Sequence, residues 1–328
     1  MEIPMKKILS ALLSILIISL SLASCNTRQE QVYPVTVNGT PIDSEIFSYF
    51  LDSTWNTAEA LGTRDGRITQ ATYMCIRYVA VNSTFTAYGL SLTDDEKVNI
   101  SDTANVLWNM FGKYYEGIGV SKQTFLKIKT YEAYIEKLRT AFYDKGGTDE
   151  ISDAVLRGIL QENFVAFRYV RTPLKNIDVY GNESELSAED VNLLNSVYNT
   201  AAGQVTTSYG IDNAYNTIVK SFPLSERSFE TKVIDRNDNE FPAVFYDTVK
   251  AQTENTVKIF QYGDSVYLVY KVNILAEGVI FSDLREECLR IVSEEPLQSK
   301  INIMCNAYQS VRDTATVKDI YERVANNR

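Results

Sequence analysis

Apolar residues recur with a helical period along most of the first half of the chain. From Ile46 to Trp55 they form one broad face, as expected for a helix that packs on a core. Asp43 is placed to cap this helix, and the apolar residues around it have the spacing of a hydrophobic staple. Further helical patterns cover 68–88, 93–111, 121–142 and 152–160, with a capping box at Thr93–Glu96. Residues 33–164 are therefore predicted to form a mainly helical N-terminal domain.

A short strand is predicted before these helices. Val35 and Val37 alternate with polar residues and lead into Asn38-Gly39, a dipeptide that favours a tight turn with positive φ. A single strand is not stable alone, so its partner has to come from another part of the chain. We expect that partner near the C-terminus, around Ala315–Val317, so that both ends of the chain build one domain.

The pattern changes near the middle of the chain, where residues 164–174 alternate as a strand does. From there to 278 the predicted order is β-α-α-β-α-β-β, with Gly263-Asp264 as the turn of the last hairpin. Residues 279–328 return to helical spacing and are expected to complete the N-terminal domain. The predicted fold class is therefore α+β, with a small α+β domain over 165–278 inserted into a mainly helical one.

The N-terminus has the pattern of an export signal. Two lysines precede Ile8–Ser24, an uncharged run rich in Leu and Ile, which predicts a signal peptide over residues 1–24. The run ends in LASC, which resembles the bacterial lipobox and implies that Cys25 carries a lipid. Several acyl chains would hold the protein on the outer face of the bacterial cell membrane. Residues 25–32 would form a tether. The alternative is an ordinary signal peptide in which Cys25 is coincidental.

Composition excludes several kinds of chemistry. The formal charge is −10, from 42 acidic and 32 basic residues, which argues against nucleic acid as a partner. The sequence contains 0 histidines, which rules out Ser-His-Asp triads, Cys-His pairs and His-ligated zinc. No calcium-loop pattern is present, and neither a metal nor a cofactor is expected.

Three cysteines lie beyond the predicted lipobox: Cys75, Cys288 and Cys305. They are odd in number, far apart in sequence, and none belongs to a CxxC motif. We expect all three to be buried apolar residues. A disulfide between Cys288 and Cys305 is the alternative, and we expect it not to form because both residues fall on predicted helix.

The order of the motifs resembles that of the SurA-like and PrsA-like exported foldases. The first is VTVNGTPI, residues 35–42, followed by the capped aromatic helix. The later segments that resemble the family are YGLSLTDDE, GVSKQTFLKIKTYEAYIEKL, ISDAVLRGILQENF and FPAVFYDTVKAQTENTVKIFQYGDSVYLVYKV. The resemblance implies a SurA/trigger-factor-like chaperone domain, built from both chain ends, and an inserted parvulin-type prolyl isomerase domain over 165–278.

The inserted domain departs from that family at its catalytic positions. Parvulins carry one histidine in the first strand and one in the last, and these positions fall at or near Tyr169 and Tyr267 here. Phe241 or Phe245 would form the aromatic wall of the proline pocket, and the central Gly-Gly segment of the family is missing. The comparison therefore implies a degenerate isomerase domain.

The leading hypothesis is a membrane-anchored extracytoplasmic chaperone that binds unfolded or nascent exported polypeptides. Such binding needs exposed apolar surface, and the candidate residues are Trp55, Trp108, Met110 and Phe111. One alternative is an active parvulin-type prolyl isomerase, because tyrosine can still donate and accept hydrogen bonds. A second alternative is a surface lipoprotein that binds one fixed partner. The family resemblance also allows for a homodimer.

Overall fold

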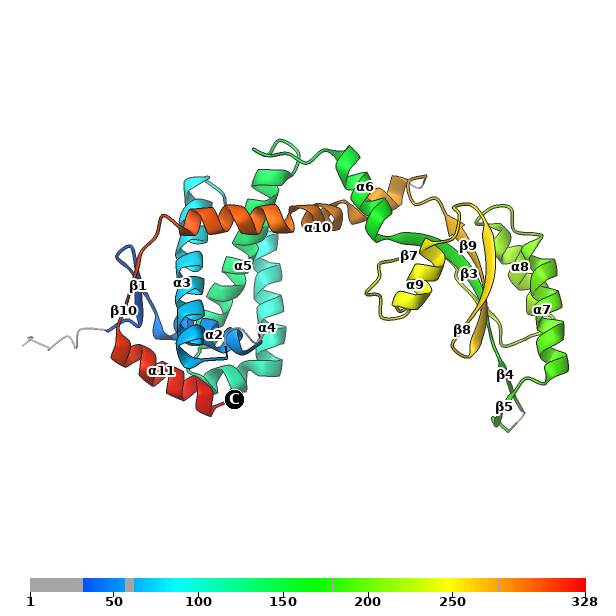
Figure 1. The fold of residues 1–328 in the computed structure, drawn as a ribbon, viewed down its shortest axis with the longest axis horizontal. Helices are drawn as coiled ribbons and strands as arrows, with labels where there is room; N and C mark the ends of the chain where they lie inside the picture. The colour runs from blue at the N-terminus through cyan, green and yellow to red at the C-terminus, as the bar shows by residue number, and fades with distance from the viewer. Residues whose placement is uncertain (1–31, 57–61, 179, 277) are drawn as a thin grey trace, which may run out of the picture. The chain divides into compact units, whose positions relative to one another are not determined.

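The computed structural model describes residues 32–56, 62–178, 180–276 and 278–328 (Figure 1). The predicted signal peptide, Cys25 and most of the tether lie outside these residues. The chain forms two compact units, and each is described by itself. The helical unit contains the described residues up to Leu138 together with Gln298–Arg328, and the sheet unit contains Arg139–Leu297. None of the helices in the described ranges is both long and apolar enough to cross a membrane.

The helical unit combines long helices with one small sheet. Its helical elements are α2 (Ser44–Ser53), η1 (Thr54–Asn56), α3 (Arg64–Ala87), α4 (Asp94–Gly117), most of α5 (Lys122–Tyr143), the end of α10 (Gly278–Cys305) and α11 (Thr314–Asn326). Its strands are β1 (Val35–Val37), β2 (Thr40–Ile42) and β10 (Ser310–Arg312). Aromatic side chains from α2, α4 and α5 pack on one another in its core.

Both ends of the chain meet in the three-stranded sheet. β1 is the central strand and pairs antiparallel with β2 on one side and with β10 on the other. Asn38 and Gly39 have φ angles of 46° and 82°, as predicted for the turn between β1 and β2. The partner from the C-terminal segment is confirmed, but its position at Ala315–Val317 is wrong. Those residues belong to α11, because the Asp313 side chain accepts a hydrogen bond from the Thr316 N–H at 2.8 Å and starts the helix.

Local signals in the sequence account for most helix starts. The capping box of Thr93 and Glu96 is formed in full at the start of α4. Asp43 occupies the cap position of α2, but its side chain makes no capping hydrogen bond and lies 3.6 Å from the Lys127 ammonium. Phe47 is 0% exposed and is buried together with the apolar residue that precedes the cap, as in a hydrophobic staple.

The sheet unit is a small antiparallel sheet with helices on both faces, so the predicted α+β class is confirmed (Figure 1). Its strands are β3 (Val165–Pro173), β4 (Lys175–Ile177), β5 (Glu183–Glu185), β6 (Glu226–Arg227), β7 (Lys232–Ile234), β8 (Val257–Tyr262) and β9 (Ser265–Val272). Its helices are α6 (Asp153–Asn163), α7 (Ala188–Ala202), α8 (Gly210–Ile218), α9 (Ala243–Lys250) and the first part of α10. The strand order is β6-β3-β9-β8, and β7 also pairs with β3. Helices α7 and α8 lie on one side of the sheet, and α9 lies on the other (Figure 1).

The compact units divide inside two helices, α5 and α10. The predicted domain boundaries at 164 and 279 lie where the sequence pattern changes. The compact sheet unit is larger, because it also includes α6 and Gly278–Leu297. The predicted hairpin turn is present between β8 and β9, where Gly263 has a φ of 58°. The antiparallel pairing of these strands runs from Tyr262 opposite Ser265 to Val257 opposite Tyr270.

Cys75, Cys288 and Cys305 are buried and free, as predicted. Cys288 and Cys305 both belong to α10, where their separation along the helix axis is far too long for a disulfide. Burial raises the pKa of the Cys288 thiol to about 11, and burial also raises the pKa of Cys75 and Cys305. These thiols are therefore neutral near pH 7 and are poor nucleophiles.

Candidate functional site

The predicted parvulin-equivalent residues come together on one face of the sheet. β3 and β9 pair so that Arg171 lies opposite Tyr267, which puts Tyr169 and Tyr267 diagonally adjacent on the same face. Their ring centroids are 5.9 Å apart. Helix α9 covers this face and brings the Phe245 ring to 5.1 Å from Tyr267. Phe241 lies just before this helix, with its ring 5.6 Å from Tyr169.

A cavity of about 230 Å³, here called the aromatic pocket, opens beside these rings. Its lining residues are Tyr169, Arg171, Glu240, Phe241, Tyr262, Gly263, Asp264 and Tyr267. Phe245 does not line it and is 0% exposed, so this residue belongs to the core beneath the pocket. Sequence reasoning missed the polar rim of Arg171, Glu240 and Asp264, because no local motif marks residues that only the sheet register brings together.

The two phenols of the aromatic pocket are neutral over the physiological range. Burial is the main cause that raises the pKa of Tyr169 and of Tyr267 above the usual value. Each hydroxyl can therefore donate and accept a hydrogen bond, but neither can exchange protons near neutral pH as imidazole does. At the rim, the Arg171 Nη2 lies 3.7 Å from the Asp264 carboxylate, and its Nε donates to Ser265 at 3.0 Å. The pocket can hold an apolar side chain between aromatic rings.

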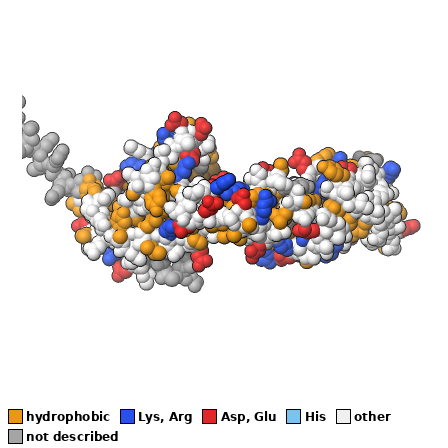
Figure 2. All heavy atoms as spheres, turned by 90° about the horizontal axis from the view of Figure 1, so that it is seen from above, with side chains coloured by type: hydrophobic (Ala, Val, Ile, Leu, Met, Phe, Trp, Pro, Cys, Tyr) orange, Lys and Arg blue, Asp and Glu red, His pale blue; other side chains and the backbone are white. Residues whose placement is uncertain are grey.

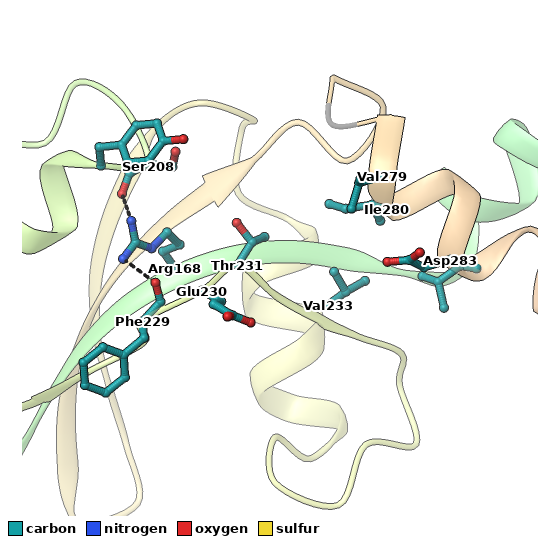
Figure 3. A pocket seen from close by; sticks show the side chains of 11 residues that line it. Arg168, Ser208, Phe229, Glu230, Thr231, Val233, Val279, Ile280 and Asp283 are labelled. Carbon is teal, nitrogen blue, oxygen red and sulfur yellow. Dashed lines mark hydrogen bonds between the residues drawn. The ribbon is translucent and has the colours of Figure 1, made fainter.

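A larger hollow lies at the other edge of the same sheet, over the gap between β6 and β7 (Figure 3). It has a volume of about 660 Å³ and is here called the Arg168 hollow. Its lining residues are Arg168, Ser208, Tyr209, Phe229, Glu230, Thr231, Val233, Val279, Ile280, Asp283 and Leu284. No local motif predicts this hollow, and its one signal in the sequence is an arginine inside the apolar strand β3.

Arg168 holds the interrupted strand edge in place. Its side chain is almost fully buried, and its Nη2 donates to the carbonyl oxygens of Ser228 at 3.0 Å and Phe229 at 3.1 Å. Its Nη1 donates to the Ser208 carbonyl at 3.1 Å (Figure 3). The carboxylate of Asp212 lies 3.3 Å from Nη2 and offsets the buried charge. The guanidinium thus satisfies carbonyl groups that the β-ladder leaves unpaired between β6 and β7.

The four predicted peptide-binding residues do not form one site. Trp55 lies in η1, where its ring is 5.7 Å from Tyr321 and carries the Arg67 guanidinium at 4.5 Å. Trp108 is half-buried against Phe125, with ring centroids 5.6 Å apart. The remaining two, on the solvent side of α4, are exposed: Met110 at 67% and Phe111 at 47%.

Met110 and Phe111 belong to an apolar stripe along the outer side of α4. Val106 is 60% exposed and Leu107 is half-buried, and these residues precede Met110 and Phe111 by one helical turn. The four residues Val106, Leu107, Met110 and Phe111 are here called the α4 stripe. The opposite side of α4 faces the core through Trp108 and Tyr115. Hydrophobic side chains gather on the visible face of the helical unit in Figure 2.

Three solved structures of the foldase protein PrsA are similar to this chain. The one from Lactococcus lactis is 11% identical, with 90% of this chain and 99% of that chain covered and a TM-score of 0.35. The one from Streptococcus pneumoniae is 13% identical, with 77% and 81% covered and a TM-score of 0.30. The one from Bacillus subtilis is 12% identical, with 86% and 80% covered and a TM-score of 0.20. No protein-family model and no curated protein matches the sequence.

The three surfaces differ in what they offer a ligand. The aromatic pocket is small and is bounded by rings and a polar rim, whereas the α4 stripe is open and apolar. The Arg168 hollow combines both characters, with apolar walls from α10 and β7 and charged groups at its edges. None of the three contains a histidine, because the chain contains 0.

Proposed function

We propose that this protein is a lipid-anchored, extracytoplasmic chaperone that binds unfolded exported polypeptides. The α4 stripe carries the proposal. An ordinary surface helix places polar residues toward water, whereas α4 presents Val106, Met110 and Phe111 there, exposed by 60%, 67% and 47%. An apolar surface of this kind is typical of a binding site.

The chemistry of the stripe suits a ligand of variable sequence. Apolar contacts have no preferred direction, and methionine adapts to different surfaces because its side chain is unbranched and flexible. Burial of apolar area contributes about 25 cal/mol per Å², so a contact with a few side chains gives weak and reversible binding. This is the behaviour that a holding chaperone requires of its contact with an unfolded client.

The predicted lipid on Cys25 would place this binding surface next to the membrane. Several acyl chains give stable anchoring where a single chain does not, so the protein would stay where exported chains emerge. The predicted tether is short and polar, and it would keep the folded units close to that surface. Anchoring and client binding together make up the proposed role.

The sheet unit is proposed to be a non-catalytic, isomerase-like module. Two neutral phenols stand where the resemblance places catalytic histidines, and the aromatic pocket is large enough for one apolar side chain. The second candidate function is prolyl isomerase activity. It is favoured by the grouping of Tyr169, Phe241 and Tyr267 around one cavity, because twisting a prolyl amide requires no covalent step.

The α4 stripe can be tested with the chain from Asn26 onward, which retains every described residue. We expect Val106→Gln/Met110→Gln to require about tenfold more protein to suppress the aggregation of a chemically unfolded client, since it removes two apolar contacts of roughly 0.7 kcal/mol each. Glutamine retains helix propensity, so the circular dichroism and the unfolding midpoint should not change. Asn109→Gln/Lys113→Gln, also on α4, is the matched control. The proposal fails if the unmodified chain does not suppress aggregation, or if the stripe variant suppresses it equally well.

The second candidate is tested by following the cis–trans isomerisation of a proline-containing peptide. We expect no acceleration above the uncatalysed rate, because tyrosines stand where the resemblance places both catalytic histidines of the family. Tyr169→Phe/Tyr267→Phe retains the rings and removes both hydroxyls, and Tyr270→Phe on the other face of β9 is the control. If the unmodified chain accelerates isomerisation, and the double variant loses this activity while the control retains it, the sheet unit is a tyrosine-dependent isomerase and not a non-catalytic module.

A further inference from the structure

Three large apolar side chains stand exposed around the Arg168 hollow. Phe229 is 81% exposed, Tyr209 is 79% exposed and Val279 is 70% exposed. All three line the hollow together with the more buried Ile280. Isolated exposed apolar residues are common on proteins, but several around one cavity are typical of an interaction surface.

The charged groups at the hollow are not balanced. The positive charge of Arg168 is offset by Asp212, which also lies 2.5 Å from Arg227. Glu230 and Asp283 are exposed and line the hollow, and neither has an ion-pair partner among the described residues. Figure 3 shows Asp283 on α10 beside Ile280, across the hollow from Thr231 and Val233. The local field therefore favours a positively charged ligand.

Arg168 also retains one unused hydrogen-bond donor. The residue is 5% exposed and lines the hollow, and its Nε–H has no acceptor within the described part of the chain. A buried donor without an acceptor is unfavourable, so the site gains if a ligand brings an oxygen to it. A free carboxylate would be repelled by the two acidic residues, whereas a neutral carbonyl oxygen would not. A peptide backbone supplies such an oxygen at every residue.

We propose that the Arg168 hollow binds an extended polypeptide segment in which a lysine or arginine lies next to an apolar residue. The aliphatic stem of the basic side chain packs on Val233 and Ile280, and its charged end pairs with Glu230 and Asp283. The apolar neighbour contacts Phe229 at the rim. A backbone carbonyl of the segment accepts from the Arg168 Nε–H. This inference rests on the proposed chaperone function and adds a preference for basic, apolar stretches among its clients.

The overall charge supports the same occupant. The chain has a formal charge of −10, so it attracts basic segments from a distance and repels acidic ones. The α4 stripe selects only for apolar character, because its four residues are uncharged. The hollow is the one of these two surfaces that can discriminate by charge.

The test measures binding of a fluorescein-labelled, unstructured peptide of alternating Lys and Phe to the chain from Asn26 onward. We expect Glu230→Gln/Asp283→Asn to weaken binding about fivefold to thirtyfold, since each exposed ion pair contributes roughly 0.5–1 kcal/mol. Both residues are exposed, so the variant should fold normally. Glu286→Gln/Glu295→Gln changes the net charge equally on exposed positions of α10 outside the hollow, and it should bind as the unmodified chain does. The loss in the first variant should largely disappear at high salt.

Further variants and peptides separate the apolar contribution to binding from the charged one. Phe229→Ala should weaken the Lys–Phe peptide severalfold and have little effect on a Lys–Ser peptide, because only the first peptide has an apolar neighbour for the rim. A Glu–Phe peptide should bind weakly to every variant. The inference is wrong if both double variants lower affinity equally, since the effect would then be one of net charge, or if inorganic phosphate competes with the peptide at the hollow. The α4-stripe variant, assayed on aggregation, decides the chaperone function separately.

Discussion

Phe245→Ala is expected to lower the free energy of unfolding of the sheet unit by about 3–5 kcal/mol. The side chain is 0% exposed and is surrounded by rings, with centroids 4.7 Å away at Phe241, 5.1 Å at Tyr267 and 5.2 Å at Phe260. Its removal leaves a cavity that rigid aromatic neighbours cannot fill without leaving their rotamers. The same cavity would merge with the aromatic pocket above it.

The measurement is urea unfolding followed by a probe for each unit. Trp55 and Trp108, the 2 tryptophans of the chain, both lie in the helical unit, so their fluorescence reports that unit alone. Far-ultraviolet circular dichroism reports both units. We expect the tryptophan transition to stay in place while part of the dichroism transition moves to lower urea. Val244→Ala, exposed at 67% on the same helix, is the control and should move neither. A tryptophan transition that moves equally would contradict the division into two independently stable units.

Val37→Asp is expected to destabilise the helical unit by about 3–5 kcal/mol. Val37 is 0% exposed in β1, between Thr40 of β2 and Ser310 of β10, so the new carboxylate would be buried without a partner. Burial raises the pKa of a carboxyl group in the folded state above its value in the unfolded state. The folded protein then binds the proton more tightly, so the loss of stability should be largest at neutral pH and shrink as the pH falls.

Tryptophan fluorescence during urea unfolding at pH 7 and pH 5 measures this effect. Thr40→Asp adds the same group at an exposed position of the neighbouring strand and should cost less than about 1 kcal/mol. If the Val37→Asp and Thr40→Asp variants unfold at the same urea concentration, the paired strands β1 and β10 are not part of the core of this unit.

Structural elements that depend on residues close together in the sequence could be predicted. The capping box at Thr93 and Glu96 depends on residues three positions apart, and the Asn38-Gly39 turn depends on two adjacent residues, so both were readable directly. The aromatic pocket was predicted in part through the resemblance, which placed Tyr169 in the first strand of the inserted domain and Tyr267 in the last. The register of β3 and β9 then brings those two rings together.

Two kinds of feature could not be predicted: segments where strand propensity competes with a helix cap, and contacts between residues far apart in the sequence. Thr314, Thr316 and Val317 have the branched side chains of a strand, yet the cap at Asp313 makes them helical and moves the strand to Ser310–Arg312. Trp55 and Trp108 differ little in sequence context from Met110 and Phe111, and only the tertiary packing of the helical unit decides which are exposed. Arg168 finds its acceptors at Ser208, Ser228 and Phe229, forty or more positions later in the chain.

The pairing of β1 with β10 also sets an order of events during synthesis. The Asn38 side chain accepts a hydrogen bond from the Gln309 N–H, 271 residues further along. While the chain is being made, β1 has only β2 as a neighbour, and a two-stranded hairpin is marginal by itself. The sheet unit is continuous in sequence and can fold as soon as Leu297 has emerged, which shortens the open loop between the two strands. The helical unit is therefore begun first and completed last.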